Sequence, residues 1–206
     1  STLPEPPHVH VIDHETVLRR QQAYGYTHED LRIILQPMAE KGEEPIGSMG
    51  TDAALAVLSD RPRLLFDYFK QLFAQVTNPP LDAIREELVT SLGIALGPGH
   101  NLFDPGPQSV RELELPSPLL TNAELDRIRH ANTSGELPEL AAVTLSTLFD
   151  PASGGAGLRD AVDRLRREAD EAIAAGAKVI ILSDRGSGPH TAPMPSLLAE
   201  IGRAHV

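Results

Sequence analysis

The stretches "LAAVTLSTLFD" at residues 140–150 and "KVIILSD" at residues 178–184 decide the fold class. Both are short apolar runs rich in β-branched residues, which is typical of buried strands. Between them, "GGAGLRDAVDRLRREADEAIAAGA" at residues 154–177 has the apolar period of a helix, which we predict over about 158–175. A strand, a helix and a strand joined by short connections form a βαβ unit, so the two strands are predicted to be parallel.

The first half of the chain is predicted to be mainly helical. Thr27 and Asp30 have the spacing of a capping box and precede an apolar helical pattern, which Pro37 is expected to break or kink. Residues 64–76 carry a wide apolar stripe at helical spacing and are predicted to form a deeply buried helix.

Two further helices are predicted between this portion and the βαβ unit. The first covers residues 81–92 and has an apolar face formed by Leu81, Ile84, Leu88, Val89 and Leu92. The second begins near Ala123, with Thr121 or Asn122 as its N-cap. The predicted fold class is therefore α/β, with parallel βαβ units and an additional helical N-terminal portion.

Composition and charge exclude several classes of function. The 206 residues include no cysteine, so they offer no disulfide, thiolate zinc site or iron–sulfur ligand. The net charge of −11 argues against non-specific binding to nucleic acids and to anionic membrane surfaces. Because the sequence shows neither an apolar run of membrane length nor a signal peptide, we expect a cytoplasmic protein without nucleic-acid or membrane partners.

No candidate site in the sequence is complete. His8 and His10 could bind a metal on one face of a strand, as in a small metallohydrolase, but an exposed edge strand explains them more simply. The glycines at residues 154–157 could bind an anion at a helix N-terminus, but they match no phosphate-binding motif and suit a flexible connection. Three serines lack the surroundings of a nucleophile: Ser91, Ser146 and Ser183.

Asp184 and Arg185 occupy the most site-like position. They follow the second predicted strand, and ligands of α/β folds favour the carboxyl ends of parallel strands. The two side chains could equally pair with each other or cap the following turn. From the residues alone we predict no catalytic, cofactor-binding or metal-binding residue.

Four stretches carry a resemblance to a known family. They are "EEPIGSMGTDAALAVLSDRPRLLFDYFKQLFAQVTNPPLDAIREELVTSLG" (43–93), "LPSPLLTNAEL" (115–125), "GLRDAVDRLRREADEAIAAGAKVIILSDRG" (157–186) and "APMPSLLA" (192–199). In this order and with few gaps, the chain resembles the central domain of the glutamate synthase large subunit. The resemblance covers residues 1–199, as a fragment. The ending "EIGRAHV" (200–206) resembles the translation of a common sequencing-adapter sequence and is expected to be non-native.

The resemblance implies a role within a larger enzyme. In the family, a glutaminase domain hydrolyses L-glutamine, and the ammonia passes through an internal tunnel to an FMN-binding synthase domain. There it combines with 2-oxoglutarate, and reduction by FMN, with electrons delivered through a 3Fe-4S cluster, gives L-glutamate. The central domain carries no cofactor and connects the two catalytic domains, which are its expected partners in the same chain. A small NADPH-dependent subunit is a further partner in some members.

The resemblance also suggests what the adjacent prolines at residues 79 and 80 do. It implies that Thr77, Asn78, Pro79 and Pro80 lie near the ammonia tunnel and pack on the synthase domain, where the rigid prolines would hold the wall in place. Further tunnel or interdomain contacts are expected at Ser48, Met49, Asp184 and Arg185. Alone, the fragment is predicted to be inactive. A free-standing α/β scaffold or binding module with the same fold is the alternative, and the electron donor stays open.

Overall fold

The computed structural model describes residues 14–42, 58, 60, 64–69, 81–97, 101, 103–133, 135 and 137–204. The described residues belong to two compact units, 14–69 and 81–204. The second unit contains the βαβ element that the sequence predicts.

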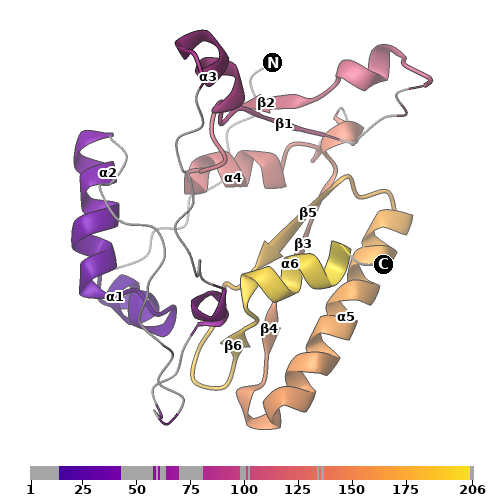
Figure 1. Ribbon diagram of the computed structural model, residues 1–206. Coiled ribbons are helices and arrows are strands. Elements are labelled where there is room, and N and C mark those ends of the chain that lie inside the picture. Colours follow the sequence, from indigo (N-terminus) through magenta and orange to yellow (C-terminus); the bar gives the residue numbers. More distant parts are fainter. Residues whose placement is uncertain are drawn as a thin grey trace. The chain divides into compact units, whose positions relative to one another are not determined.

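Two parallel strands and one long helix form the centre of this unit (Figure 1). Strand β3, Ala142–Ser146, pairs in parallel with β5, Val179–Ser183, and helix α5, Gly154–Ala174, lies between them in sequence. Ala142 is opposite Val179 and Ser146 is opposite Ser183. The predicted parallel βαβ unit and the α/β fold class are therefore confirmed.

The segment predicted as a single strand over residues 140–150 is divided at Thr147. The N–H of Thr147 donates to the carbonyl of Ser183 at 2.9 Å, and its carbonyl accepts from the N–H of Met194 at 2.8 Å. The chain then continues as β4, Leu148–Phe149, which pairs in antiparallel with β6, Ala192–Pro193. Thr147 is buried, and these two bonds satisfy its backbone while the chain moves from one partner strand to another.

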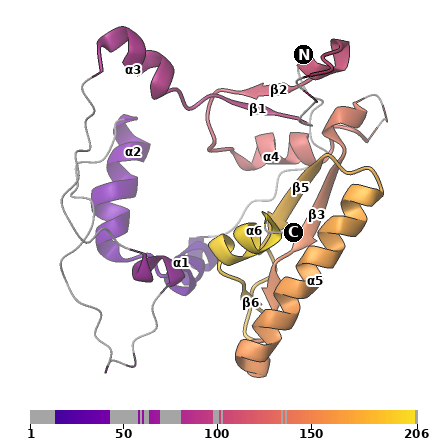
Figure 2. The same cartoon turned by 45° about the vertical axis from the view of Figure 1, so that its right-hand side comes forward.

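The core of the unit lies where α5 meets β3 and helix α6, Ser196–Ala204. Figures 1 and 2 both show α5 and α6 side by side. The buried side chains of this cluster are Leu145, Ala161, Val162, Leu165, Ala169, Met194 and Ala199. The α5 residues predicted to face inward are thus confirmed, with Leu158 packed at the edge of the cluster. Burial of one large aliphatic side chain such as Leu165 contributes about 1.5–3 kcal/mol.

Helix α5 begins four residues before the predicted start. A short 3₁₀ turn, η5 (Pro151–Ser153), precedes it, and the Asp150 carboxylate accepts from the N–H of Ala152 at 2.9 Å. The glycines at 154–157 therefore form the first turn of the helix rather than a flexible connection. The other end follows the prediction, because Gly176 has a φ of 101° and ends the helix in a Schellman motif.

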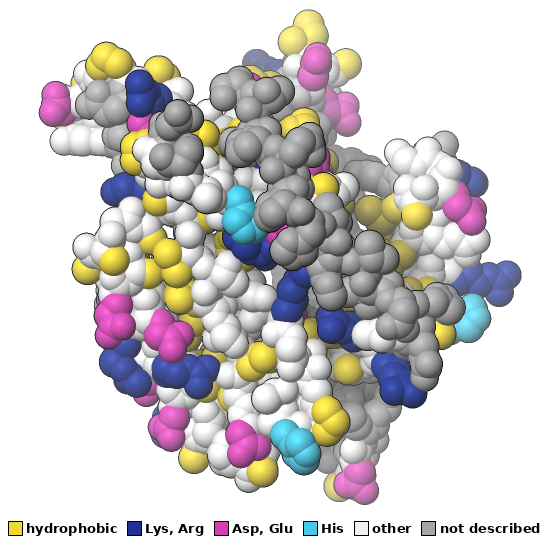
Figure 3. Space-filling model, turned by 180° about the vertical axis from the view of Figure 1, so that it is seen from behind, with side chains coloured by type: hydrophobic (Ala, Val, Ile, Leu, Met, Phe, Trp, Pro, Cys, Tyr) yellow, Lys and Arg dark blue, Asp and Glu magenta, His cyan; other side chains and the backbone are white. Residues whose placement is uncertain are grey.

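The outer side of α5 is charged. Figure 3 shows acidic and basic side chains interspersed along it. Arg164 lies 3.5 Å from Glu168 and Arg166 lies 3.3 Å from Asp163, each pair one helical turn apart. These exposed pairs keep the polar face in water, and each contributes a few tenths of a kcal/mol.

The remaining elements of this unit precede β3 in sequence. They are α3 Ala83–Val89, β1 Ile94–Leu96, η3 Pro107–Val110, β2 Leu113–Leu115, α4 Asn122–Arg129 and η4 Pro138–Leu140. Strands β1 and β2 form an antiparallel pair. Helix α4 contacts strand β3 through Arg129, whose side chain donates to the Thr144 hydroxyl at 3.4 Å. The same guanidinium pairs with Asp126 of its own helix. The predicted apolar face of α3, in contrast, is exposed to solvent.

The other unit contains α1 His14–Ala23, η1 Asp30–Leu35, α2 Gln36–Lys41 and the short η2 Leu65–Tyr68. The predicted capping box is confirmed, since Thr27 donates its N–H and hydroxyl to the Asp30 carboxylate at 2.8 and 2.7 Å. Pro37 does not break the helix. The turns before it widen into a π-helical segment, η1, which continues directly into α2, and the proline lies within the first two positions of α2.

The structure tests two further predictions only within the described residues: the buried helix over 64–76 and the lack of a membrane-spanning segment. Of the helix predicted over residues 64–76, the structure describes only Leu64 to Phe69, where Tyr68 and Phe69 are largely exposed. Every helix in the described ranges is too short or too polar to cross a lipid bilayer.

Candidate functional site

The predicted site at the carboxyl end of β5 is a tight polar turn. Strand β5 ends at Ser183, and the carbonyl of Asp184 accepts from the N–H of Ser187 at 3.3 Å. Gly186 lies between them with a φ of 95°, which favours glycine, and its carbonyl accepts from the Thr191 hydroxyl at 2.9 Å. The turn is therefore fixed by its own hydrogen bonds.

Asp184 and Arg185 do not pair with each other among the contacts of the described residues. Arg185 instead extends to α4, where its guanidinium donates to the side-chain oxygen of Asn122 at 3.0 Å. The backbone N–H of Arg185 donates to the Ser183 hydroxyl at 3.3 Å. Of the two alternatives that the sequence left open, ion pairing is absent, and Asp184 closes the turn through its backbone carbonyl.

Asn122, which accepts the hydrogen bond from Arg185, is the first residue of helix α4. Thr121 is the N-cap of α4, and its N–H and hydroxyl donate to the Glu124 carboxylate at 2.7 and 2.8 Å. In return, the N–H of Glu124 donates to the Thr121 hydroxyl at 3.2 Å. The bonds from the Thr121 backbone and hydroxyl lower the pKa of the Glu124 carboxyl. The first turn of α4 thus holds Asn122 in place for Arg185.

The turn at the end of β5 presents two charged side chains to solvent. Asp184 and Arg185 are exposed, and Ser146 lies opposite Ser183 at the ends of the two strands. Among the described residues no cluster of His, Asp and Glu could hold a metal ion.

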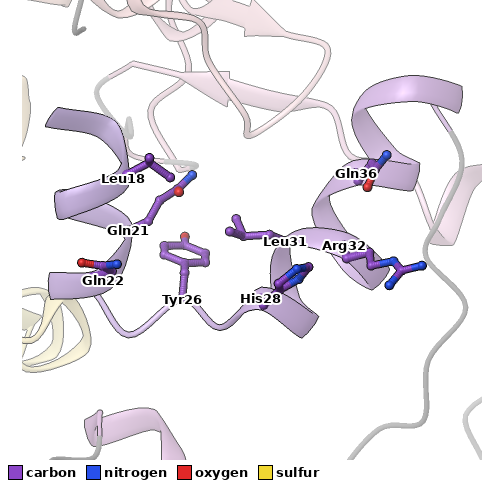
Figure 4. A pocket seen from close by; sticks show the side chains of 8 residues that line it. All are labelled: Leu18, Gln21, Gln22, Tyr26, His28, Leu31, Arg32 and Gln36. Carbon is purple, nitrogen blue, oxygen red and sulfur yellow. The ribbon is translucent and has the colours of Figure 1, made fainter. Parts of the chain in front are cut away.

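The structure also contains a hollow that the sequence did not indicate. It has a volume of about 380 Å³ and is lined by residues of α1 and of the helix that follows: Leu18, Gln21, Gln22, Tyr26, His28, Leu31, Arg32 and Gln36. Figure 4 shows the side chain of Leu31 pointing toward the ring of Tyr26 in this space. The capping box fixes the turn between the two helices, and the side chain of Thr27 lowers the pKa of the Asp30 carboxyl there. The capping box of Thr27 and Asp30 is the feature of the sequence that predicted this turn.

Most of the other candidate residues lie outside the described ranges. They are His8, His10, Ser48, Met49, Thr77, Asn78, Pro79 and Pro80. Of the predicted contact residues, the described ranges include Asp184 and Arg185, and there Arg185 contacts Asn122, which the sequence indicated as a possible helix cap. Ser91 is exposed, and its hydroxyl accepts from the N–H of Gly93 at 3.3 Å.

The fold defines an α/β domain with an exposed polar turn at the end of its parallel strands. Residues 19–205 match the glutamate synthase central domain family, and the chain belongs to that family. It is 44% identical over 191 residues to the NADH glutamate synthase of Schizosaccharomyces pombe, which covers 93% of this chain and 9% of the relative.

Two further relatives agree. Ferredoxin-dependent glutamate synthase 2 of Synechocystis is 44% identical over 94% of this chain, and the large chain of the NADPH glutamate synthase of Azospirillum brasilense is 44% identical over 91%. The chain spans 12% of each. The three relatives are named for three different electron donors, so the similarity does not select a donor.

Proposed function

We propose that this chain is a segment of a glutamate synthase, which makes L-glutamate from L-glutamine and 2-oxoglutarate by reductive transfer of channelled ammonia. The observation that carries the proposal is the family match over residues 19–205. It is supported by 41–44% identity to several proteins named glutamate synthase, of which the chain spans 9–12%.

Within this enzyme, the proposed role of the domain is to connect the glutaminase and FMN synthase domains. An iron–sulfur cluster is held by cysteine thiolates, and the 206 residues contain none, so they do not fit the 3Fe-4S cluster of the parent. The cluster is therefore assigned to another part of the parent chain, and FMN is assigned to the synthase domain, as the resemblance implies. A small NADPH-dependent subunit remains a proposed partner, and the fragment alone is proposed to be inactive.

We further propose that two groups of residues contact the neighbouring domains. Thr77, Asn78, Pro79 and Pro80, with Ser48 and Met49, would line or support the ammonia tunnel. Asp184 and Arg185 would form a separate polar contact, which is supported by their exposure and by the bond from Arg185 to Asn122. Because that bond orients the guanidinium before association, less side-chain entropy is lost when a partner binds.

Substitution of Thr77 in the full-length parent tests the tunnel assignment. Thr77→Phe adds bulk and should uncouple the half-reactions, so that glutamine consumed per glutamate formed rises above one. Thr77→Val is the matched control, because it keeps the shape and removes only a hydroxyl, a loss of about 0.5–1.5 kcal/mol for one hydrogen bond. Glutamate formation from added ammonia should survive in both variants.

An unchanged ratio in the Thr77→Phe variant means that the tunnel assignment is wrong and that Thr77 only stabilises the turn. The wider assignment has an independent test in the gene. A glutaminase domain with a cysteine nucleophile should be encoded before these residues, and an FMN barrel with cluster cysteines should follow. Their absence would favour the free-standing scaffold.

A further inference from the structure

Helix α3 carries an apolar face that no element of the described residues buries. Its members and the leucine that follows them are Ile84, Leu88, Val89 and Leu92, with exposed fractions of 83%, 80%, 64% and 66%. Single exposed leucines are common on protein surfaces. Ile84, Leu88 and Val89 share one side of α3 by helical spacing, and Leu92 follows the helix, so exposed large apolar side chains gather here, as is typical of an interaction site.

The helix itself is well specified, so the exposed face is a feature of a formed element. The Asp82 carboxylate is its N-cap and accepts from the N–H groups of Ile84 and Arg85 at 3.1 and 3.0 Å. A seven-residue helix is nevertheless too short to be stable in water by itself. Burial of its apolar face is the contribution that α3 lacks.

Charges around the face indicate the chemistry of its partner. By helical spacing Arg85 lies on the apolar side, four residues before Val89, and it already pairs with Asp82 at 3.4 Å. Glu86 and Glu87 lie on the two flanks and are exposed. The complementary surface is therefore apolar at its centre and carries Lys or Arg at its edge.

The length of the relatives indicates where that surface comes from. The chain spans 9–12% of the glutamate synthases it resembles, so about nine tenths of each lies outside these residues. We propose that the apolar face of α3 is a docking surface for the flanking polypeptide of the parent chain, which presents an apolar patch with a basic rim. This inference rests on the proposed function, because it assumes that the residues belong to such a long chain.

Hydrogen exchange of the α3 amides, followed by mass spectrometry, tests the proposal. The 206-residue chain and the full-length parent are compared in the same buffer. In the parent, peptides covering residues 83–92 should exchange about 100-fold more slowly than in the 206-residue chain, because docking suppresses local unfolding. Equal exchange rates in the two proteins would overturn the proposal. Slow exchange in both would mean that residues within the 206-residue chain cover α3, and fast exchange in both would mean that nothing covers it in the parent.

Two variants of the parent identify the face. Leu88→Glu places a charge in the apolar stripe and should abolish the extra protection, whereas Ala83→Glu adds the same charge on the opposite side and should keep it. Identical behaviour of the two variants would contradict the proposal. Protection that depends on protein concentration would also contradict it, since a second copy would then cover the face. The tunnel assignment is read from the ratio of glutamine to glutamate, so either idea can fail alone.

Discussion

Helices α5 and α3 carry the same kind of apolar stripe, and the two stripes have opposite surroundings. On α5, Ala161, Leu165 and Ala169 are 3%, 1% and 1% exposed, because β3 and α6 pack against them. On α3, Ile84 and Leu88 are 83% and 80% exposed. Apolar spacing therefore identifies the face that a helix can bury. Whether that face is buried depends on which other elements pack against it.

The two helices also begin differently. Helix α3 starts at a side-chain cap, Asp82, as α4 does at Thr121, whereas α5 has no side-chain cap at Ser153. A helix with a fully buried face is stabilised mainly by packing. The shorter and less buried helices depend more on local hydrogen bonds at their first turn.

The largest expected effect is at Leu165. Leu165→Ala removes the most buried large side chain of the core and should lower the free energy of unfolding by about 2–5 kcal/mol, through lost burial and a cavity. Urea denaturation followed by circular dichroism measures it. Arg159→Ala on the exposed side of α5 is the control and should change stability little. A loss below about 1 kcal/mol at Leu165 would mean that α5 is not the core helix.

A smaller effect is expected from the cap of α4. Thr121→Ala removes the hydroxyl that accepts from the Glu124 N–H and should cost about 1 kcal/mol. Thr121→Ser keeps the hydroxyl and should retain most of the stability. The free energy of unfolding of Arg185→Ala shows whether the hydrogen bond from Arg185 to Asn122 stabilises the start of α4 in addition to the Thr121 cap. If serine were as harmful as alanine, the capping bond would not be the cause.

The cap of α4 should also depend on pH. The pKa of Glu124 is lowered in the folded state, so the contribution of its carboxylate is present above the ordinary pKa and is lost as the pH falls through the folded value. The difference between wild type and Glu124→Gln should therefore be largest near pH 7 and shrink in acid. Denaturation at pH 7 and pH 3 measures this; a difference that grows in acid would refute the assigned sign.

The smallest effect is expected at Leu88 in the 206-residue chain. Because the side chain is already in water, Leu88→Ala should change the free energy of unfolding by no more than about 0.5 kcal/mol. The same denaturation assay detects the change, with Leu165→Ala as the reference for a buried leucine. A loss comparable to that of Leu165→Ala would show that α3 is covered within this chain and would remove the contrast between the two helices.

The sequence predicted what depends on local pattern. The buried face of α5, the parallel pairing of β3 with β5, the capping box at Thr27 and the position of the α4 cap follow from the local sequence. It did not predict the division at Thr147, since that residue exchanges partners between two distant segments, 183 and 194. Nor did it predict the bond from Arg185 to Asn122, because 63 residues separate the two and only the folded chain brings them together.

The candidate site was predictable to a smaller extent. Asp184 and Arg185 lie on an exposed turn after β5, as the strand prediction implies, while their role in a contact stays a prediction. The function came from resemblance, which the family match confirms at the level of the central domain. The exposure of α3 could not be read from its sequence, because an amphipathic pattern is the same whether or not a partner is present.

The first turn of α5 imposes a rule on evolution as well as on folding. A Cβ atom at Gly157 would overlap the side chain of Ser153, whose hydroxyl is held by the carbonyl of Asp150. Gly155 has open space at the same position and carries no such restriction, whereas Gly154 has a φ of 60°, which favours glycine whatever the space around it. Among descendants of this sequence, residues 153 and 157 should therefore change together or not at all, while position 155 varies independently and position 154 stays glycine. A paired substitution library at these four positions would measure that covariation directly.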